Sequence, residues 1–170
     1  MKLSDAGELG LLRELESRGL IEGTEHDAAQ LSDGLVVTQD ALVDGVHFRF
    51  DRLSWRELGF RAAAVNISDL AASAARPEAL LVTLALPGEI EVDDVVALYE
   101  GLGEPGVPIR GGDTTRAGQV VISVTALGRS ERVPGRTGTV PPLSPAPPIP
   151  ARTARHRLRR LRAAWPAASS

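Results

Sequence analysis

The chain has 170 residues, of which 43% are apolar and none is cysteine, and its formal net charge is −3. This length and apolar content are typical of one globular domain with a hydrophobic core, and the absence of cysteine excludes disulfides and thiolate metal sites. No apolar run approaches the roughly 20 residues that a membrane span needs, and the first residues lack the apolar stretch of a signal peptide. We therefore expect a cytoplasmic protein without a membrane partner.

Three helices are predicted, because three stretches carry apolar residues at helical spacing. The first begins with Asp5 and Glu8, which have the spacing of a capping box, and the second begins in the same way with Ser54 and Glu57. The helices are expected at residues 5–19, 54–75 and 92–102.

Short apolar runs bounded by turn residues predict strands between these helices. They are expected at residues 35–38, 80–86, 107–110 and 120–127. Because helices and strands are mixed along the chain, the fold class is α+β.

The charge divides the chain into two parts. Residues 1–133 hold 12 Lys and Arg and all 22 Asp and Glu, a net charge of −10, and this acidity argues against nucleic acid as the main ligand. Residues 134–170 hold 7 Arg, no acid and 8 of the 12 prolines. We expect a domain over the first part and a disordered tail over the second. The alternative for residues 152–165 is a basic amphipathic helix for a membrane or an acidic partner.

Four carboxylates stand beside small or turn residues and are candidates for a metal site. They are Asp27, Asp40, Asp69 and Asp113. Hard cations such as Mg²⁺ take oxygen ligands, and a phosphate supplies the rest. The glycines before Asp113 let the backbone approach an anion closely. Each aspartate taken alone is better explained by a turn or a helix cap, so only their convergence in space would indicate a metal.

Asp69 is a special case because its predicted helix is apolar. An unpaired buried charge is very costly, so this carboxylate needs a partner. The partner is either an arginine, such as Arg61 or Arg76, or a metal ion. Asn66 lies three residues earlier and shares the same helix face.

These segments together resemble the thiamine-monophosphate kinases, in the superfamily of aminoimidazole ribonucleotide synthetase. Residues 38–48, TQDALVDGVHF, resemble that family's T-T-D-x-L-V-x-G-x-H-F, and residues 64–72, AVNISDLAA, resemble A-V-N-x-S-D-L-A-A. Residues 111–116, GGDTTR, match G-G-D-T-T-R, and residues 7–12, GELGLL, resemble G-E-F-x-L-I. The resemblance covers residues 1 to about 138.

The resemblance implies phosphorylation of thiamine monophosphate to thiamine diphosphate, with ATP as co-substrate and Mg²⁺ as cofactor. It also implies the N-terminal domain of the aminoimidazole ribonucleotide synthetase-like fold, a mixed sheet with flanking helices, and a homodimer formed through this domain. By motif, His47 falls on a substrate-binding position, Gly112 and Asp113 on the ATP phosphate site, and Arg136 on a nucleotide-contacting position. The metal positions implied are Asp27, Thr38, Gln39, Asp40, Asp69 and Asp113.

The chain departs from the family pattern at several points. His26 stands where the family has a carboxylate, Gln39 replaces a hydroxyl residue, and the third helix is several residues short. The match ends after Gly138, so we expect a truncated kinase with little activity and a tail that arises from a shifted reading frame. The alternatives are a non-catalytic fragment that dimerises or binds Mg²⁺-nucleotide, and another superfamily member with a different substrate.

Overall fold

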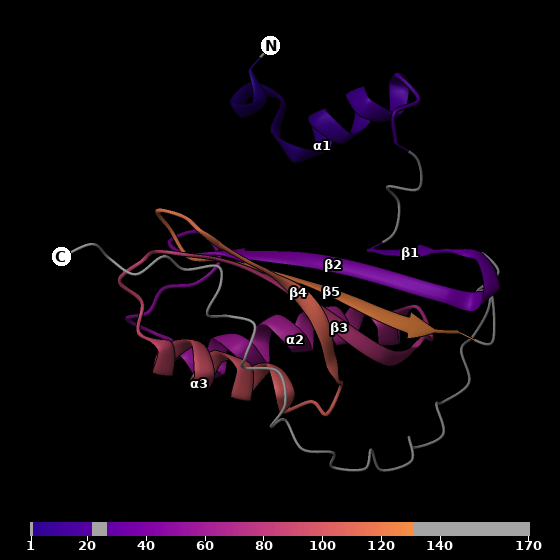
Figure 1. Cartoon of the computed structure of the whole chain (residues 1–170). Coiled ribbons are helices and arrows are strands. Elements are labelled where there is room, and N and C mark those ends of the chain that lie inside the picture. The colour runs from indigo at the N-terminus through magenta and orange to yellow at the C-terminus, as the bar shows by residue number, and fades with distance from the viewer. Residues whose placement is uncertain (1, 22–26, 131–170) are drawn as a thin grey trace.

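The computed structural model describes residues 2–21 and 27–130, and its body is a sheet covered on one face by two helices (Figure 1). The five strands lie in the order β1–β2–β5–β3–β4. The predictions for His26, Arg136 and residues 134–170 lie outside the described residues. The strands are β1 Ala28–Gln30, β2 Leu35–Val43, β3 Arg76–Leu86, β4 Ile109–Arg116 and β5 Val121–Arg129, and the helices are α1 Leu3–Ser17, α2 Trp55–Ala72 and α3 Val92–Gly103, with a 3-10 turn at Ser32–Gly34.

The sheet is mixed. β2 pairs antiparallel with β1 and β5, β5 pairs antiparallel with β3, and β3 runs parallel to β4. Two parallel strands need a crossover between them, and α3 provides it. The predicted α+β class, with a mixed sheet and flanking helices, is confirmed.

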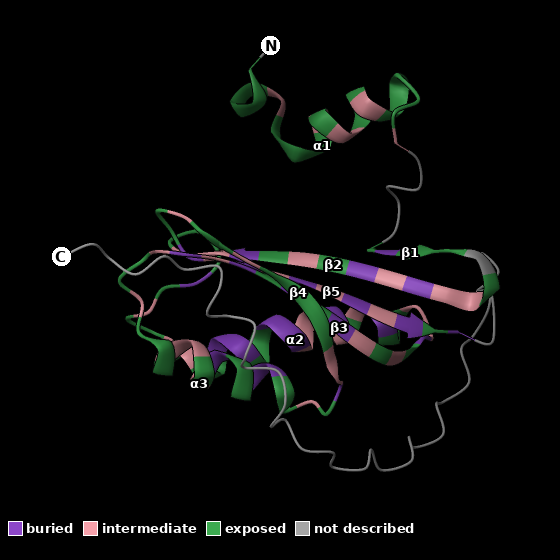
Figure 2. Cartoon of the chain, in the orientation of Figure 1, coloured by how far each residue is buried: buried purple, intermediate pink, exposed green. Residues whose placement is uncertain are grey.

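The core lies between the sheet and α2. α2 contacts β2, β3 and β5, and α3 packs against α2. Successive residues of a strand point to opposite faces, so burial alternates along the strands, as Figure 2 shows for β2. The other face of the sheet is open and half-exposed. The buried strand residues include Val36, Leu42, Leu80, Val82, Leu84, Ile122, Val124 and Ala126.

The predicted start of α2 is confirmed. The backbone N–H of Ser54 donates to Glu57 Oε2 at 2.8 Å, and the N–H of Glu57 donates to Ser54 Oγ at 3.3 Å, which is the reciprocal pair of a capping box. The helix ends at Ala72 rather than near residue 75, because Ala74 has a positive φ of 53° and β3 begins two residues later. None of the helices in the described part of the chain is long and apolar enough to cross a membrane.

The first helix forms, but differently from the prediction. α1 starts at Leu3, and its first turn is held by the Lys2 N–H donating to Asp5 Oδ2 at 3.2 Å, so Asp5 and Glu8 do not form the expected capping box. Gly7 interrupts the helix with a φ of 62°. α1 buries none of its residues and lies apart from the sheet (Figure 1).

The strands are longer than predicted, and in β2 and β4 this moves the candidate motifs. β2 continues to Val43 and β4 continues to Arg116, so Asp40 and Asp113 lie inside strands and not at turns or strand ends. The short edge strand β1 was not predicted. Apolar runs mark only the buried residues of these strands, whereas their polar ends are held by pairing with β5 and β3.

Candidate functional site

Three of the four candidate aspartates lie near one another, where the last turns of α2 face β2. Asp40 occupies the face of β2 that points toward the helices, on the same side as Thr38 and Leu42. Asp69 lies in the last part of α2, and Asp27 directly precedes β1, whose Ala28 pairs with Thr38. The charges of Asp40 and Asp27 both act on the Asp69 carboxyl. The sheet register and α2 thus bring together residues up to 42 positions apart in sequence.

Thr38 connects the three elements. Its side chain is 3% exposed, and its hydroxyl lies 3.1 Å from the Asp27 carbonyl oxygen and 3.4 Å from Asp69 Oδ2. A hydroxyl has a single proton, so these two acceptors share it or compete for it. Thr38 therefore links Asp27 and Asp69 but leaves the charge of the Asp69 carboxylate in place.

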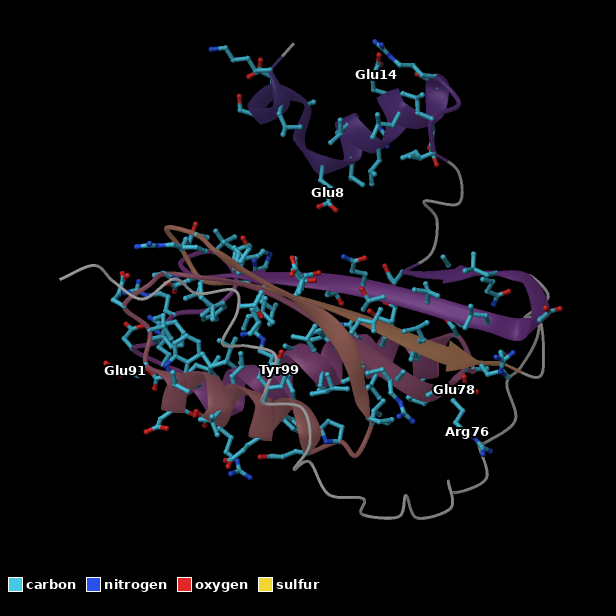
Figure 3. The ribbon with its side chains drawn as sticks, viewed as in Figure 1. Glu8, Glu14, Arg76, Glu78, Glu91 and Tyr99 are labelled. Atoms are coloured by element: carbon cyan, nitrogen blue, oxygen red, sulfur yellow. The ribbon has the colours of Figure 1, made fainter. Side chains whose placement is uncertain are left out.

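The electrostatics of Asp69 show an uncompensated carboxylate. Burial raises the pKa of the Asp69 carboxyl above its ordinary value, and the charges of Asp40 and then Asp27 raise it further. The hydrogen bond from Thr38 opposes the shift, and a hydrogen bond between Asp69 and Asp40 adds to it. In the described part of the chain, the groups that act on this carboxyl include neither of the arginines expected as partners. Figure 3 shows one of them, Arg76, beside Glu78 at the beginning of β3.

This raised pKa predicts how the metal-free protein responds to pH. Because the folded state raises the pKa, Asp69 favours folding when protonated and opposes it increasingly as the pH rises above the ordinary carboxyl value of about 4. We expect Asp69→Asn to raise the melting temperature in EDTA at pH 7, and the gain to vanish below about pH 4. Thermal unfolding from pH 3 to pH 8 measures this. Equal melting temperatures at neutral pH would contradict it.

A buried amide lies on α2 three residues before Asp69. Asn66 is fully buried on the inner face of α2, and its Nδ2 donates to the Ala62 carbonyl oxygen at 3.1 Å. Its Oδ1 is buried and has no hydrogen-bond partner within the described residues. The sequence places Asn66 on the helix face of Asp69, but a missing hydrogen bond is visible only in three dimensions.

Gln39 and His47 lie away from the three aspartates. Gln39 points to the open face of the sheet, where its Nε2 donates to Ser123 Oγ at 3.0 Å. His47 is exposed in the loop after β2, and its Nδ1 accepts a hydrogen bond from the Val43 N–H at 3.1 Å, so a neutral imidazole carries its proton on Nε2. Val43 is three residues from Asp40, or about 10 Å along a strand that rises about 3.3 Å per residue.

Gly112 and Asp113 lie across the sheet from the aspartates. Asp40, Val124, Val82 and Gly112 form one row over four strands, so the first and last Cα atoms are roughly 14 Å apart at about 4.8 Å per strand. Asp113 pairs with Thr83 and shares the open face of the sheet, opposite to the face of Asp40. Within one chain the fourth aspartate therefore does not converge with the other three.

The donor set fits a hard cation that also binds a phosphate. Within residues 2–21 and 27–130, no three His, Asp or Glu side chains are arranged closely enough to hold a metal ion alone. Mg²⁺ is usually held by one or two carboxylates, with water and substrate phosphates completing the coordination. The carboxylates of Asp40 and Asp69 supply oxygen donors of the kind that such a site requires.

Comparisons with known sequences agree with the motifs. Residues 25–130 match the family model described as AIR synthase related protein, N-terminal domain. The thiamine-monophosphate kinase of Synechococcus elongatus is 39% identical over 134 residues, covering 74% of this chain and 41% of that protein. That of Rhodopirellula baltica is 44% identical over 108 residues, covering 61% of this chain and 34% of that protein. The chain thus spans less than half the length of these relatives.

Solved structures agree as well. The crystal structure of thiamine monophosphate kinase from Aquifex aeolicus superposes with a TM-score of 0.73 and 30% identity, covering 82% of this chain and 48% of that one. The structure of AaThiL complexed with AMPPCP and TMP gives a TM-score of 0.74 and 30% identity, covering 82% and 47%. The predicted resemblance to thiamine-monophosphate kinases is confirmed in both sequence and fold.

Proposed function

The chain belongs to the family of AIR synthase related protein N-terminal domains, and on this basis we propose that it is the metal- and phosphate-binding part of a thiamine-monophosphate kinase. The observation that carries the proposal is the cluster of Asp27, Asp40 and Asp69 around Thr38, which lies inside the matched residues. Support for ATP and thiamine monophosphate as substrates comes from AaThiL, which was solved with AMPPCP, an ATP analogue, and TMP.

The chemistry of phosphoryl transfer matches this cluster. The reaction depends on positioning the phosphates and neutralising their charge more than on covalent help from the protein. Mg²⁺, when bound, supplies that neutralisation. The chain's own contribution is to hold three carboxylates at fixed positions on β2, α2 and the segment before β1, with Thr38 orienting Asp69.

The remaining assignments are proposed on the motif matches. Gly112 and Asp113 would contact nucleotide phosphates from β4. Asp113 and Gln39 would also contribute metal ligands, and both lie on the open face of the sheet. His47 would contact thiamine monophosphate from the loop after β2. The proposed homodimer also rests on the motif matches, and a second copy would cover a sheet edge that one chain leaves open. A cytoplasmic location is part of the same proposal and agrees with the cysteine-free sequence.

A second candidate is a domain that binds Mg²⁺-nucleotide without turnover. The favouring observation is that the chain covers 41% of the length of the Synechococcus kinase. Transfer requires both reactants to be fixed closely, which demands more of a protein than binding one of them does.

The proposed site predicts that the chain binds Mg²⁺ with AMPPCP and that Asp40→Asn weakens this binding at least tenfold. Removing one carboxylate from a charge-balanced site should cost more binding free energy than the roughly 1.4 kcal/mol that a tenfold change in affinity represents. Calorimetry with purified protein measures the affinity, and Asp93→Asn, which removes an exposed carboxylate from α3, is the matched control.

An assay of thiamine diphosphate formation separates the two candidates. Turnover with ATP, Mg²⁺ and thiamine monophosphate would establish a kinase, whereas binding without turnover would establish the nucleotide-binding domain. Equal affinities for wild type and Asp40→Asn, or no binding of AMPPCP by either, would refute the site itself.

A further inference from the structure

The His47 side chain is exposed, yet the main chain of Val43 holds it in one orientation. The backbone N–H of Val43 donates to His47 Nδ1 at 3.1 Å, and the backbone N–H of His47 donates to the Val43 carbonyl oxygen at 2.8 Å. Exposed side chains ordinarily change rotamer within nanoseconds, and their ordering weakens the binding of a ligand. In this protein the imidazole is already ordered without a ligand.

The loop that carries His47 is itself closed by main-chain hydrogen bonds. The Val46 N–H donates to the Val43 carbonyl oxygen at 3.1 Å, and the Gly45 N–H donates to the Phe48 carbonyl oxygen at 2.8 Å. Gly45 has a φ of 74°, a conformation that glycine adopts without strain. Phe48 is 5% exposed and belongs to the hydrophobic core, so it anchors the end of the loop. The imidazole therefore has a defined position relative to the end of β2.

The contact with Val43 leaves one polar atom of the imidazole for another molecule. A backbone N–H can only donate, so Nδ1 accepts this hydrogen bond and carries no proton. The proton of the neutral ring is therefore on Nε2, for which the protein provides no hydrogen-bond partner within residues 2–21 and 27–130. An N–H of fixed direction recognises a hydrogen-bond acceptor and rejects a donor.

The distance to the aspartates indicates which part of a substrate this donor meets. Asp40 lies three residues before Val43, or about 10 Å along the strand, whereas a hydrogen bond spans about 3 Å. A phosphate held beside Asp40 is therefore too far from an imidazole that is bound to Val43. Thiamine monophosphate also has an organic part, and the nitrogens of its aminopyrimidine ring are hydrogen-bond acceptors.

We propose that His47 donates a hydrogen bond from Nε2 to a ring nitrogen of the aminopyrimidine of thiamine monophosphate, and that the main chain of Val43 fixes the tautomer and the direction of this donor. The inference rests on the proposed function, which places His47 beside that substrate. The loop after β2 then recognises the base, and the phosphate is bound elsewhere. A purely structural His47 would only close the loop, for which the contact of Nδ1 is enough.

His47→Asn and His47→Gln separate the two nitrogens of the imidazole. The asparagine oxygen is bonded to Cγ, as Nδ1 is, so it can still accept from Val43, but nothing replaces the Nε2 donor. The glutamine nitrogen lies two bonds beyond Cγ, as Nε2 does, and keeps a donor there. His47→Asn should keep the wild-type melting temperature and lose roughly tenfold in calorimetric affinity for thiamine monophosphate, a typical effect of one hydrogen bond. His47→Gln should bind more tightly than His47→Asn.

A structural role for His47 predicts wild-type affinity in His47→Asn, and that result would overturn the proposal. A glutamine variant that binds no more tightly than the asparagine variant would overturn it too. Thiamine, which lacks the phosphate, should show the same roughly tenfold loss in His47→Asn. A loss confined to thiamine monophosphate would place His47 at the phosphate and contradict the assignment to the base, as would a wild-type chain that binds neither compound.

Mg²⁺ with AMPPCP provides the control that separates this inference from the proposed function. His47→Asn should bind Mg²⁺-AMPPCP as wild type does, and a weaker affinity would mean that the substitution disturbs the fold and would overturn the assignment. Absence of AMPPCP binding, with binding of thiamine that still depends on His47, would refute the proposed phosphate site and leave the contact of His47 with the base intact.

Discussion

Replacing Gly101 with alanine is expected to destabilise the domain by about 3 kcal/mol, because α2 and α3 touch at this position. A Cβ on Gly101 would overlap the Arg56 carbonyl oxygen and lie 2.8 Å from the Phe60 backbone nitrogen. These are backbone atoms of α2, which cannot rotate away as a side chain would. The two helices would have to separate and open the contacts of Leu98 and Leu102, both fully buried.

Gly103 provides the matched control. It lies on the same helix two residues later, and a Cβ there would meet nothing within 4 Å. Gly103→Ala should therefore leave stability unchanged or raise it by up to about 1 kcal/mol, which is the helix propensity of alanine over glycine. Urea unfolding of both variants measures the difference. If Gly101→Ala were as stable as Gly103→Ala, the close contact between α2 and α3 would be wrong.

The elements that the sequence predicted best are those whose signals are local. The capping box of Ser54 and the apolar periodicity of α3 depend only on neighbours a few residues away, and both helices form as expected. β1 and the second half of β4 carry no such signal. The three residues of β1 are a strand only because β2 supplies hydrogen bonds. Gly111 and Gly112, read as a turn, lie inside β4 because that strand pairs with β3.

The candidate site also has a part that the sequence predicts and a part that only the folded structure shows. The aspartates were recognised from motif positions, and the neighbouring charges of Asp27, Asp40 and Asp69 agree with a shared site. Sequence could not show that Asp113 occupies the opposite face of the sheet, because that depends on the strand order and on the β3–β4 register. It could not show the orphaned oxygen of Asn66 either, since satisfaction of a polar atom is a property of the packed state.

Gly112→Ala is expected to have the largest effect on nucleotide binding of any substitution in β4. Gly112 has a φ of 146°, a conformation that residues with a Cβ rarely adopt, and a Cβ there would overlap the Val82 carbonyl oxygen and lie 2.6 Å from its carbon. Backbone strain costs about 1–3 kcal/mol, and the overlap adds to it. β4 would then shift away from β3 and carry Asp113 with it.

Gly111→Ala separates this effect from the mere loss of a glycine. A Cβ on Gly111 would lie 3.6 Å from Leu81 Cδ2, an ordinary contact, so this variant should keep the stability and nucleotide affinity of wild type. Gly112→Ala should lose about 3 kcal/mol of stability and at least tenfold in affinity for Mg²⁺-AMPPCP, measured by urea unfolding and calorimetry. Asp40 and Asp69 lie on the helix-covered side of the sheet, opposite to the face of Asp113. The affinity for Mg²⁺ alone should therefore survive in the folded fraction. Loss of nucleotide with retention of Mg²⁺ would assign the phosphates to β4. Loss of neither would remove Gly112 and Asp113 from the site and leave the aspartates of β2 and α2 as its centre.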